Sequence, residues 1–252
     1  MGIGGSARND GVNFISDSFT VNFTMGKDGV YVIRTSNRII KNSKFVDTIC
    51  KIPFLKALYK LFASDRLVAV SIAVIIVLDV LNARYSISSE SSIWMRIAMV
   101  ITFAFTLGFL FYTIKRTIFR AKLTRSFHGA EHKTIYAMEN KMELTLENVR
   151  ECPRIARRCG TNLVVFLLPI NFVLSFFTPY ASLQFILSFM LAYEIFDAKR
   201  APELPVIRLF YKLGYFCQEK LFTSEPTNDQ LIAAIATMKK LLELESSAAA
   251  EA

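Results

Sequence analysis

The sequence predicts a mainly α-helical, polytopic membrane protein with about four transmembrane helices, a small N-terminal β-hairpin and cytoplasmic helices. Three observations support this fold class. The 252 residues are 53% apolar, and the mean hydropathy of +0.37 exceeds that of ordinary soluble domains. Basic residues cluster beside the apolar stretches. Those stretches have roughly the 17–25 residues that a spanning helix needs: 67–83, 93–114, 161–178 and 180–196.

The first segment, residues 1–63, is expected to be cytoplasmic. Between Phe19 and Thr35, two β-prone runs, FTVNFTM and VYVIRTS, surround the turn signal GKDG. This pattern predicts the β-hairpin. Residues 43–63 mix apolar and basic side chains around Pro53, which is typical of a helix that lies on a membrane surface.

The predicted spans form two pairs, within residues 64–114 and 161–197, and basic side chains flank the first pair at both ends. Positive charge marks the cytoplasmic side of a span, so both termini should be cytoplasmic and the protein should be multi-pass in the inner membrane. This placement favours membrane lipids as partners and argues against nucleic acid; the oligomeric state stays open. The flanking residues are Lys51, Lys56, Lys60 and Arg66, then Lys115, Arg116, Arg120, Lys122 and Arg125.

Residues 198–252 are expected to form cytoplasmic helices. Residues 206–222 are amphipathic and rich in aromatic side chains, and residues 227–229 resemble a helix N-cap before QLIAAIATMKKLLELE. Leu231, Ile235, Met238 and Leu242 recur at helical spacing in that last run. It should therefore pack one face on the rest of the cytoplasmic part.

The remaining segment, residues 115–160, contains F-H-G-A-E-H-K at 127–133 and with it both histidines of the chain. In a helix, His128, Glu131 and His132 share one face. H-x-x-E-H is the pattern of inverted zincins, whose histidines hold Zn²⁺ while the glutamate acts as general base. The pattern predicts a divalent metal such as zinc, bound by His128 and His132, with Glu131 as the catalytic general base or as a ligand.

Such a metal site needs a further ligand, and Glu194 and Cys159 are the candidates. Glu194 falls at the cytoplasmic end of the last predicted span, where an ionisable group indicates a functional site or a pair with a basic side chain. A structural zinc site that adds Cys152 and Cys159 to the histidines is a rival, although the C-x6-C spacing is wider than usual. In a third interpretation, the histidines only form hydrogen bonds within a packed domain.

The motif and its surroundings resemble the YqhQ family of bacterial polytopic membrane proteins. FHGAEHKTIY, LTLENVR and RRCGT carry the resemblance, together with GGSARNDGV near the start, AYEIFDAKR and LFTSEPTNDQL. The family is functionally uncharacterised and is grouped with metal-dependent enzymes, so the resemblance implies a metal motif at His128, Glu131 and His132. Ala156 and Arg157 stand where the family has His-Pro, so one further possible ligand is missing.

These observations together predict a metal-dependent integral membrane enzyme, a hydrolase that acts at the cytoplasmic membrane face on a lipid-linked or membrane-embedded substrate. The alternative is a non-enzymatic scaffold or regulatory protein that binds a cytosolic partner through the same basic surface. Serine or cysteine nucleophile mechanisms lack a third histidine, and no phosphate-binding loop or dinucleotide fingerprint occurs in the sequence.

Overall fold

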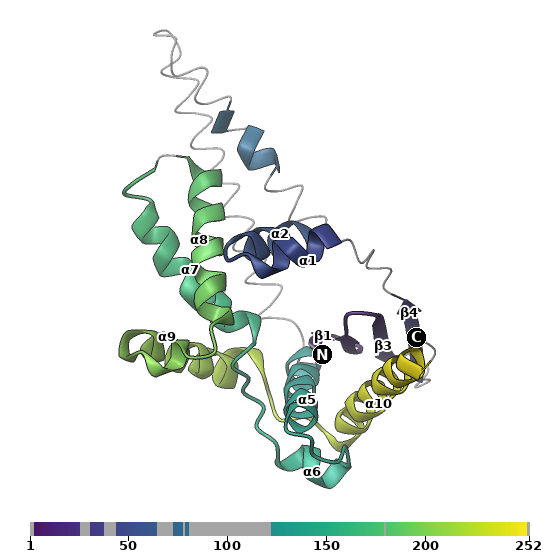
Figure 1. Ribbon diagram of the computed structural model, residues 1–252. Helices are drawn as coiled ribbons and strands as arrows, with labels where there is room; N and C mark the ends of the chain where they lie inside the picture. Colours follow the sequence, from purple (N-terminus) through teal and green to yellow (C-terminus); the bar gives the residue numbers. More distant parts are fainter. Residues whose placement is uncertain are drawn as a thin grey trace, which may run out of the picture. The chain divides into compact units, whose positions relative to one another are not determined.

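The computed structural model (Figure 1) describes residues 3–25, 31–37, 44–64, 73–77, 79–80, 122–178 and 180–250. The chain divides into two compact units. Unit 1 consists of Met1–Lys41, Lys115–Arg157 and Tyr215–Ala252, and unit 2 consists of Asn42–Ile114 and Arg158–Gly214. The N-terminal strands, the H-x-x-E-H segment and the C-terminal helix therefore fold together. The boundaries of the five segments that we assigned from the sequence stay a prediction.

Unit 1 contains a four-stranded antiparallel sheet in the order β1-β2-β3-β4. Val12 pairs with Phe23, and Phe14 pairs with Val21; all four are buried and form the core face. The predicted pairing of β3 with β4 is confirmed, but the prediction of a hairpin alone was wrong, because β1 and β2 extend the sheet. The strands are β1 Gly4–Arg8, β2 Gly11–Ile15, β3 Phe19–Met25 and β4 Tyr31–Asn37.

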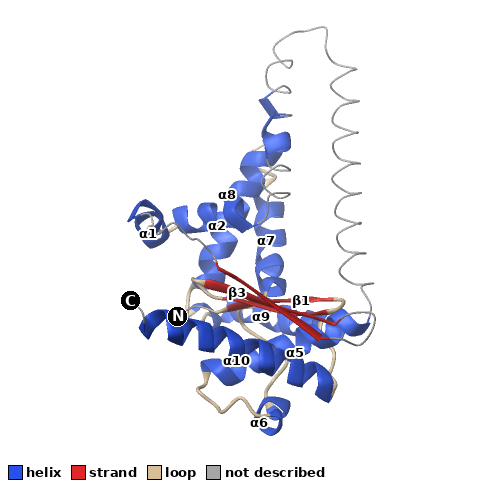
Figure 2. Cartoon of the chain, turned by 90° about the vertical axis from the view of Figure 1, so that its right-hand side faces the viewer, coloured by secondary structure: helices blue, strands red, loops and turns tan. Residues whose placement is uncertain are grey.

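Two helices, α5 (Lys122–Glu139) and α10 (Asn228–Ala250), lie along one side of this sheet (Figure 2). A short helix, α6 (Leu146–Glu151), follows α5. The predicted C-terminal helix is confirmed, and the Thr227 and Gln230 side chains each bond the other's backbone N–H at its start. Both long helices contribute residues to the hydrophobic core. These residues are Phe127, Ala130 and Ala137 of α5, and Leu231, Ala234, Ile235, Met238 and Leu241 of α10.

Unit 2 is helical in its described residues. The Lys56 ammonium of α2 lies 2.6 Å from the Asp197 carboxylate at the end of α8. One turn earlier, Glu194 Oε1 accepts a hydrogen bond of 2.7 Å from the backbone N–H of Phe54. These contacts hold the turn between α1 and α2 against α8. The helices are α1 Lys44–Lys51, α2 Leu55–Ser64, α7 Gly160–Leu174, α8 Ala181–Asp197, η1 Ala201–Glu203 and α9 Pro205–Cys217, which ends in unit 1.

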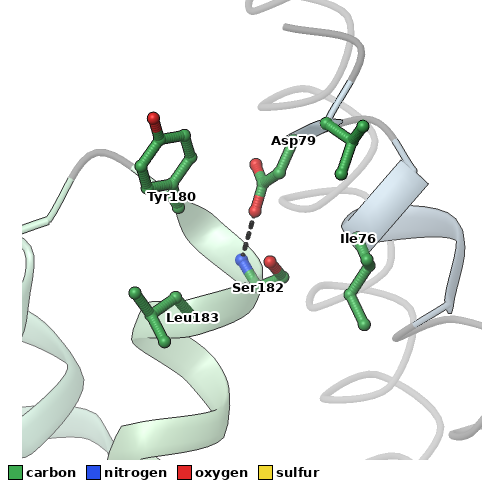
Figure 3. Close-up of a pocket in the computed structure, with 6 residues that line it drawn as sticks. Ile76, Asp79, Tyr180, Ser182 and Leu183 are labelled. Atoms are coloured by element: carbon green, nitrogen blue, oxygen red, sulfur yellow. Dashed lines mark hydrogen bonds between the residues drawn. The ribbon is translucent and has the colours of Figure 1, made fainter. Parts of the chain in front are cut away.

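A small pocket of about 200 Å³ lies at the start of α8 in unit 2 (Figure 3). Asp79 Oδ2 accepts a 2.7 Å hydrogen bond from the backbone N–H of Ser182, in the first turn of α8. A carboxylate there satisfies an amide that has no partner within the helix. Asp79 therefore has a structural role. Ile76, Val80, Tyr180 and Leu183 complete the pocket wall.

The prediction of a polytopic membrane protein was wrong. Among the described residues, none of the helices is both long and apolar enough to cross a membrane. The expected third and fourth spans correspond to α7, with 15 residues, and α8, with 17. Hydropathy counts apolar residues but does not locate helix ends, and α7 ends at Leu174, before the apolar run does. The finding contradicts the multi-pass inner-membrane localisation as well. Of the first two expected spans, only residues 73–77 and 79–80 lie within the described residues.

Candidate metal centre

The two histidines meet on one face of α5. The centroids of the His128 and His132 rings are 4.4 Å apart, and the ring planes are inclined by 62°. Their spacing of four residues is slightly more than one helical turn, and the ordered α5 helix keeps both side chains on the same side. His132 is buried and His128 is partly buried. The local geometry that we expected from the motif is therefore present.

Each imidazole is oriented by a backbone carbonyl. His128 Nδ1 lies 3.0 Å from the carbonyl oxygen of Phe222, and His132 Nδ1 lies 2.7 Å from that of Arg154. A carbonyl oxygen can only accept, so Nδ1 must carry the proton in both rings. In the neutral imidazole, the lone pair then resides on Nε2. This tautomer is the one that histidine ligands adopt when an outer hydrogen bond fixes them around a metal.

Glu131 lies between the two histidines in sequence, and its side chain is almost fully buried, with 5% exposed. Its Oε1 lies against β1 so closely that a Cβ on Gly5 would approach it to 2.5 Å. Its Oε2 is buried and has no hydrogen-bond partner in the part of the chain that the structure describes. Burial raises the pKa of this carboxyl from 4.5 to about 7, and the charge of nearby His128 opposes the rise.

This environment suits a general acid or base, because a group whose pKa lies near neutrality can both accept and release a proton at that pH. It also explains the glycine in β1. Gly5 pairs with Phe14 and so points to the core face of the sheet, where any larger residue would occupy the space of the Glu131 carboxylate. The repeated glycine of GGSAR was the signal in the sequence, since glycine inside a strand can indicate close approach of another group.

The other predicted ligands, Cys159 and Glu194, belong to unit 2. Cys159 is the N-cap residue of α7, and its Sγ lies 3.5 Å from the hydroxyl oxygen of Thr161. Glu194 contacts the backbone of Phe54, as described above. The assignment of either residue as a metal ligand stays a prediction.

Cys152, the additional ligand of the structural zinc alternative, is buried at the end of α6. Its Sγ donates to the carbonyl oxygen of Asn148 at 3.2 Å, and burial raises the pKa of this thiol. Both observations favour the protonated form, whereas zinc binds the thiolate. The environment of Cys152 therefore disfavours the structural zinc alternative.

An ion-pair cluster that the sequence did not reveal lies beside the motif. Lys133 Nζ is 2.6 Å from Glu225 Oε1 and also donates to the carbonyl oxygen of Arg150 at 2.6 Å. Arg154 reaches Glu225 Oε2 at 3.2 Å. Glu225 thus ties α5 to the chain around Arg154, whose carbonyl orients His132. No periodicity in the sequence links these three positions, because they come from separate segments.

Comparison with known proteins identifies a family but no structural precedent. The family model described as "Protein of unknown function (DUF1385)" matches residues 24–244, which include the whole motif. The "Uncharacterized protein YqhQ" of Bacillus subtilis (strain 168) is 26% identical over 152 residues, which cover 56% of this chain and 46% of that protein. The chain therefore aligns with less than half the length of this relative. The resemblance to the YqhQ family is confirmed. No solved structure matches the chain.

Proposed function

This chain belongs to the DUF1385 family, and we propose that it is a metal-dependent hydrolase with a centre built on His128 and His132. One observation carries the proposal: both imidazoles are hydrogen-bonded through Nδ1 to backbone carbonyls while their rings lie 4.4 Å apart. Two histidines packed only for stability have no need of the same tautomer on adjacent rings. Two ligands of one ion do, because each must present Nε2.

The donor chemistry fits a borderline metal such as zinc, which prefers imidazole nitrogen and thiolate sulfur. Two imidazoles and one thiolate form a suitable set; His128 and His132 would provide the imidazoles, and Cys159 is one proposed third ligand. Glu194 is the other proposed third ligand. The buried, unpartnered Oε2 of Glu131 further supports a polar group at this place, since a buried carboxylate oxygen without a partner is costly.

In the proposed reaction, Glu131 takes a proton from the attacking water and later releases it to the leaving group. Its pKa is about 7 in the metal-free chain, and a bound cation would lower it, so the carboxylate is available to accept a proton near neutral pH. When bound, the metal supplies Lewis acidity that makes a water more acidic and polarises a substrate oxygen. The helix α5 sets the order of the three side chains, and the carbonyls of Phe222 and Arg154 restrict how far the rings can turn.

The test replaces each histidine by asparagine. The Asn amide nitrogen can take the place of Nδ1 and still donate to the carbonyl oxygen, but asparagine has nothing in the position of Nε2. We expect the purified chain to bind about one zinc equivalent by mass spectrometry of metals, and the His128→Asn/His132→Asn double variant to lose it while its far-UV circular dichroism is unchanged. Binding that persists in this variant would contradict the proposal.

The catalytic part is tested separately. Glu131→Gln should retain the metal and lose hydrolysis of chromogenic ester and phosphoester substrates, because glutamine cannot take the proton. Glu139→Gln, at the exposed end of the same helix, is the matched control and should keep full activity. A wild-type chain that binds zinc but hydrolyses none of these substrates would favour the scaffold or regulatory alternative.

A further inference from the structure

The two carbonyls that orient the histidines belong to different segments of unit 1. Phe222 is the last residue of a π-helical turn, η2 (Gln218–Phe222), that follows α9. Arg154 lies in the irregular chain after α6. From η2 the chain continues beside α5 to the start of α10 (Figure 1), and the N–H of Ser224 donates to the carbonyl oxygen of Arg125 at 3.0 Å. Some contact must hold the two segments in register for both rings to be oriented together.

The side chain of Gln218 makes this contact. It is fully buried; its Oε1 accepts from the N–H of Ala156 at 2.9 Å, and its Nε2 donates to the carbonyl oxygen of Ala156 at 3.1 Å. One amide thus satisfies both backbone groups of the residue two positions after Arg154. A pair of hydrogen bonds of this kind fixes direction as well as distance, as in a β-ladder.

The backbone of Gln218 is also tied to Thr223, the residue that follows Phe222. Its carbonyl oxygen accepts from the N–H and from the hydroxyl of Thr223, each at 2.8 Å. The first of these is the i to i+5 bond of a π-turn, a rare conformation that occurs frequently at functional sites. From α5, the guanidinium of Arg125 reaches the carbonyl oxygens of Lys220 and Thr223 at 2.8 and 3.3 Å. The turn is therefore anchored to the helix that carries the histidines.

We propose that Gln218 is the positioning residue of the metal centre: by joining η2 to the chain at Ala156, it holds the carbonyls of Phe222 and Arg154 and so sets the tautomer of both histidines. Gln218 needs no contact with the metal to do this. The inference deepens the proposed function and rests on it for its meaning, but the tautomers can be measured in the metal-free protein. Outer residues that orient histidine ligands typically change metal affinity by about 10–100-fold.

The primary experiment uses Gln218→Leu and long-range ¹H–¹⁵N correlation spectra of the histidine rings in the metal-free full chain. The wild type should show both rings with the proton on Nδ1. In Gln218→Leu we expect both rings to shift toward the Nε2–H form, together with a roughly 10–100-fold loss of zinc affinity in a chelator competition. Unchanged ring tautomers in a folded Gln218→Leu variant would overturn the inference.

Gln230→Leu is the matched control, because Gln230 is also buried and its amide also makes two hydrogen bonds, to Thr227 and Ser126. It should lose comparable stability and leave both tautomers as in the wild type. Equal shifts in both variants would mean that any lost buried amide loosens the site, and the inference would fail.

Gln218→Glu provides a second variant in case the Gln218→Leu protein does not fold. A protonated Glu carboxyl can replace both hydrogen bonds to Ala156, whereas the carboxylate cannot donate. At each pH at which the wild-type rings are neutral, the ring spectra of the variant should depart from those of the wild type once the glutamate is ionised; wild-type ring tautomers beside an ionised carboxylate at position 218, detected by its carboxyl ¹³C shift, would contradict the role of Gln218. If both wild-type rings carry the proton on Nδ1 and lose this preference in Gln218→Leu, but the wild-type chain binds no zinc, the proposed function is refuted. The role of Gln218 in orienting the rings would still hold.

Discussion

Replacing Glu131 by glutamine should stabilise the protein, and should do so only above a defined pH. The carboxyl has a pKa of about 7 in the folded chain, whereas in the unfolded chain it should ionise near 4.5. The folded state thus holds the proton more tightly, and the free energy of unfolding falls as pH rises between these two values. Below about pH 4.5 the carboxyl is neutral in both states, so its burial does not lower the free energy of unfolding through ionisation. Above about pH 7 the full cost of burying the charged carboxylate applies.

The magnitude follows from the same two values. The difference between 4.5 and about 7, at about 1.4 kcal/mol per pH unit, corresponds to about 3 kcal/mol at pH 8. Glutamine has nearly the same shape and cannot ionise, so this pH dependence disappears. The stability advantage of Glu131→Gln over the wild type should therefore grow by about 3 kcal/mol between pH 4.5 and pH 8. A constant offset from repacking the amide does not affect this difference.

Urea unfolding followed by circular dichroism measures the effect, at both pH values and with a chelator present so that no metal shifts the titration. Glu139→Gln should follow the wild type at both pH values, because that carboxyl is exposed. A Glu131→Gln advantage that is the same at pH 4.5 and pH 8 would refute the burial argument.

Three further predictions concern the same site. Gly5→Ala should cost about 1–3 kcal/mol of unfolding free energy, because its Cβ would overlap Glu131 Oε1, whereas Gly4→Ala should be nearly neutral because its Cβ meets open space; thermal melts compare them, and equal effects would contradict the predicted clash. Cys159→Ser should weaken zinc binding at least tenfold in a chelator competition, while Cys152→Ser should not; a comparable loss in both variants would support the structural zinc alternative, which uses both cysteines. Because a bound cation favours the charged form of the Glu131 carboxyl, hydrolysis by the zinc-loaded chain should rise with pH at or below about 7, and a pH–rate profile that falls there would exclude this residue as the base.

The residue spacing of the H-x-x-E-H motif predicts one part of the site and not another. The four-residue interval brings the His128 and His132 rings together in any regular helix, so this part of the site could be predicted. The sequence could not predict which atoms would orient the rings. The carbonyls of Phe222 and Arg154 are backbone groups, and every residue has one.

The apolar stretches show the opposite case. Hydropathy predicted spans that include α7 and α8, and both segments are helical, but neither helix is both long and apolar enough to cross a membrane. Average hydropathy over a window responds to composition alone. The end of a helix depends on caps and turns, such as the one that follows Leu174, and these contribute little to the average.

Features that depend on short-range periodicity could be predicted from the residue pattern: the β3–β4 pairing, the apolar stripe and cap of α10, and the common face of His128, Glu131 and His132. The chemistry of that face depends instead on long-range contacts in the folded chain. Gly5, 126 positions before Glu131 in the numbering, leaves space for the Glu131 carboxylate, and burial raises the pKa of that carboxyl. Gln218 joins the segments that orient both histidines. Burial and hydrogen-bond partners come from residues far apart in the chain, and no local pattern records which of them will meet.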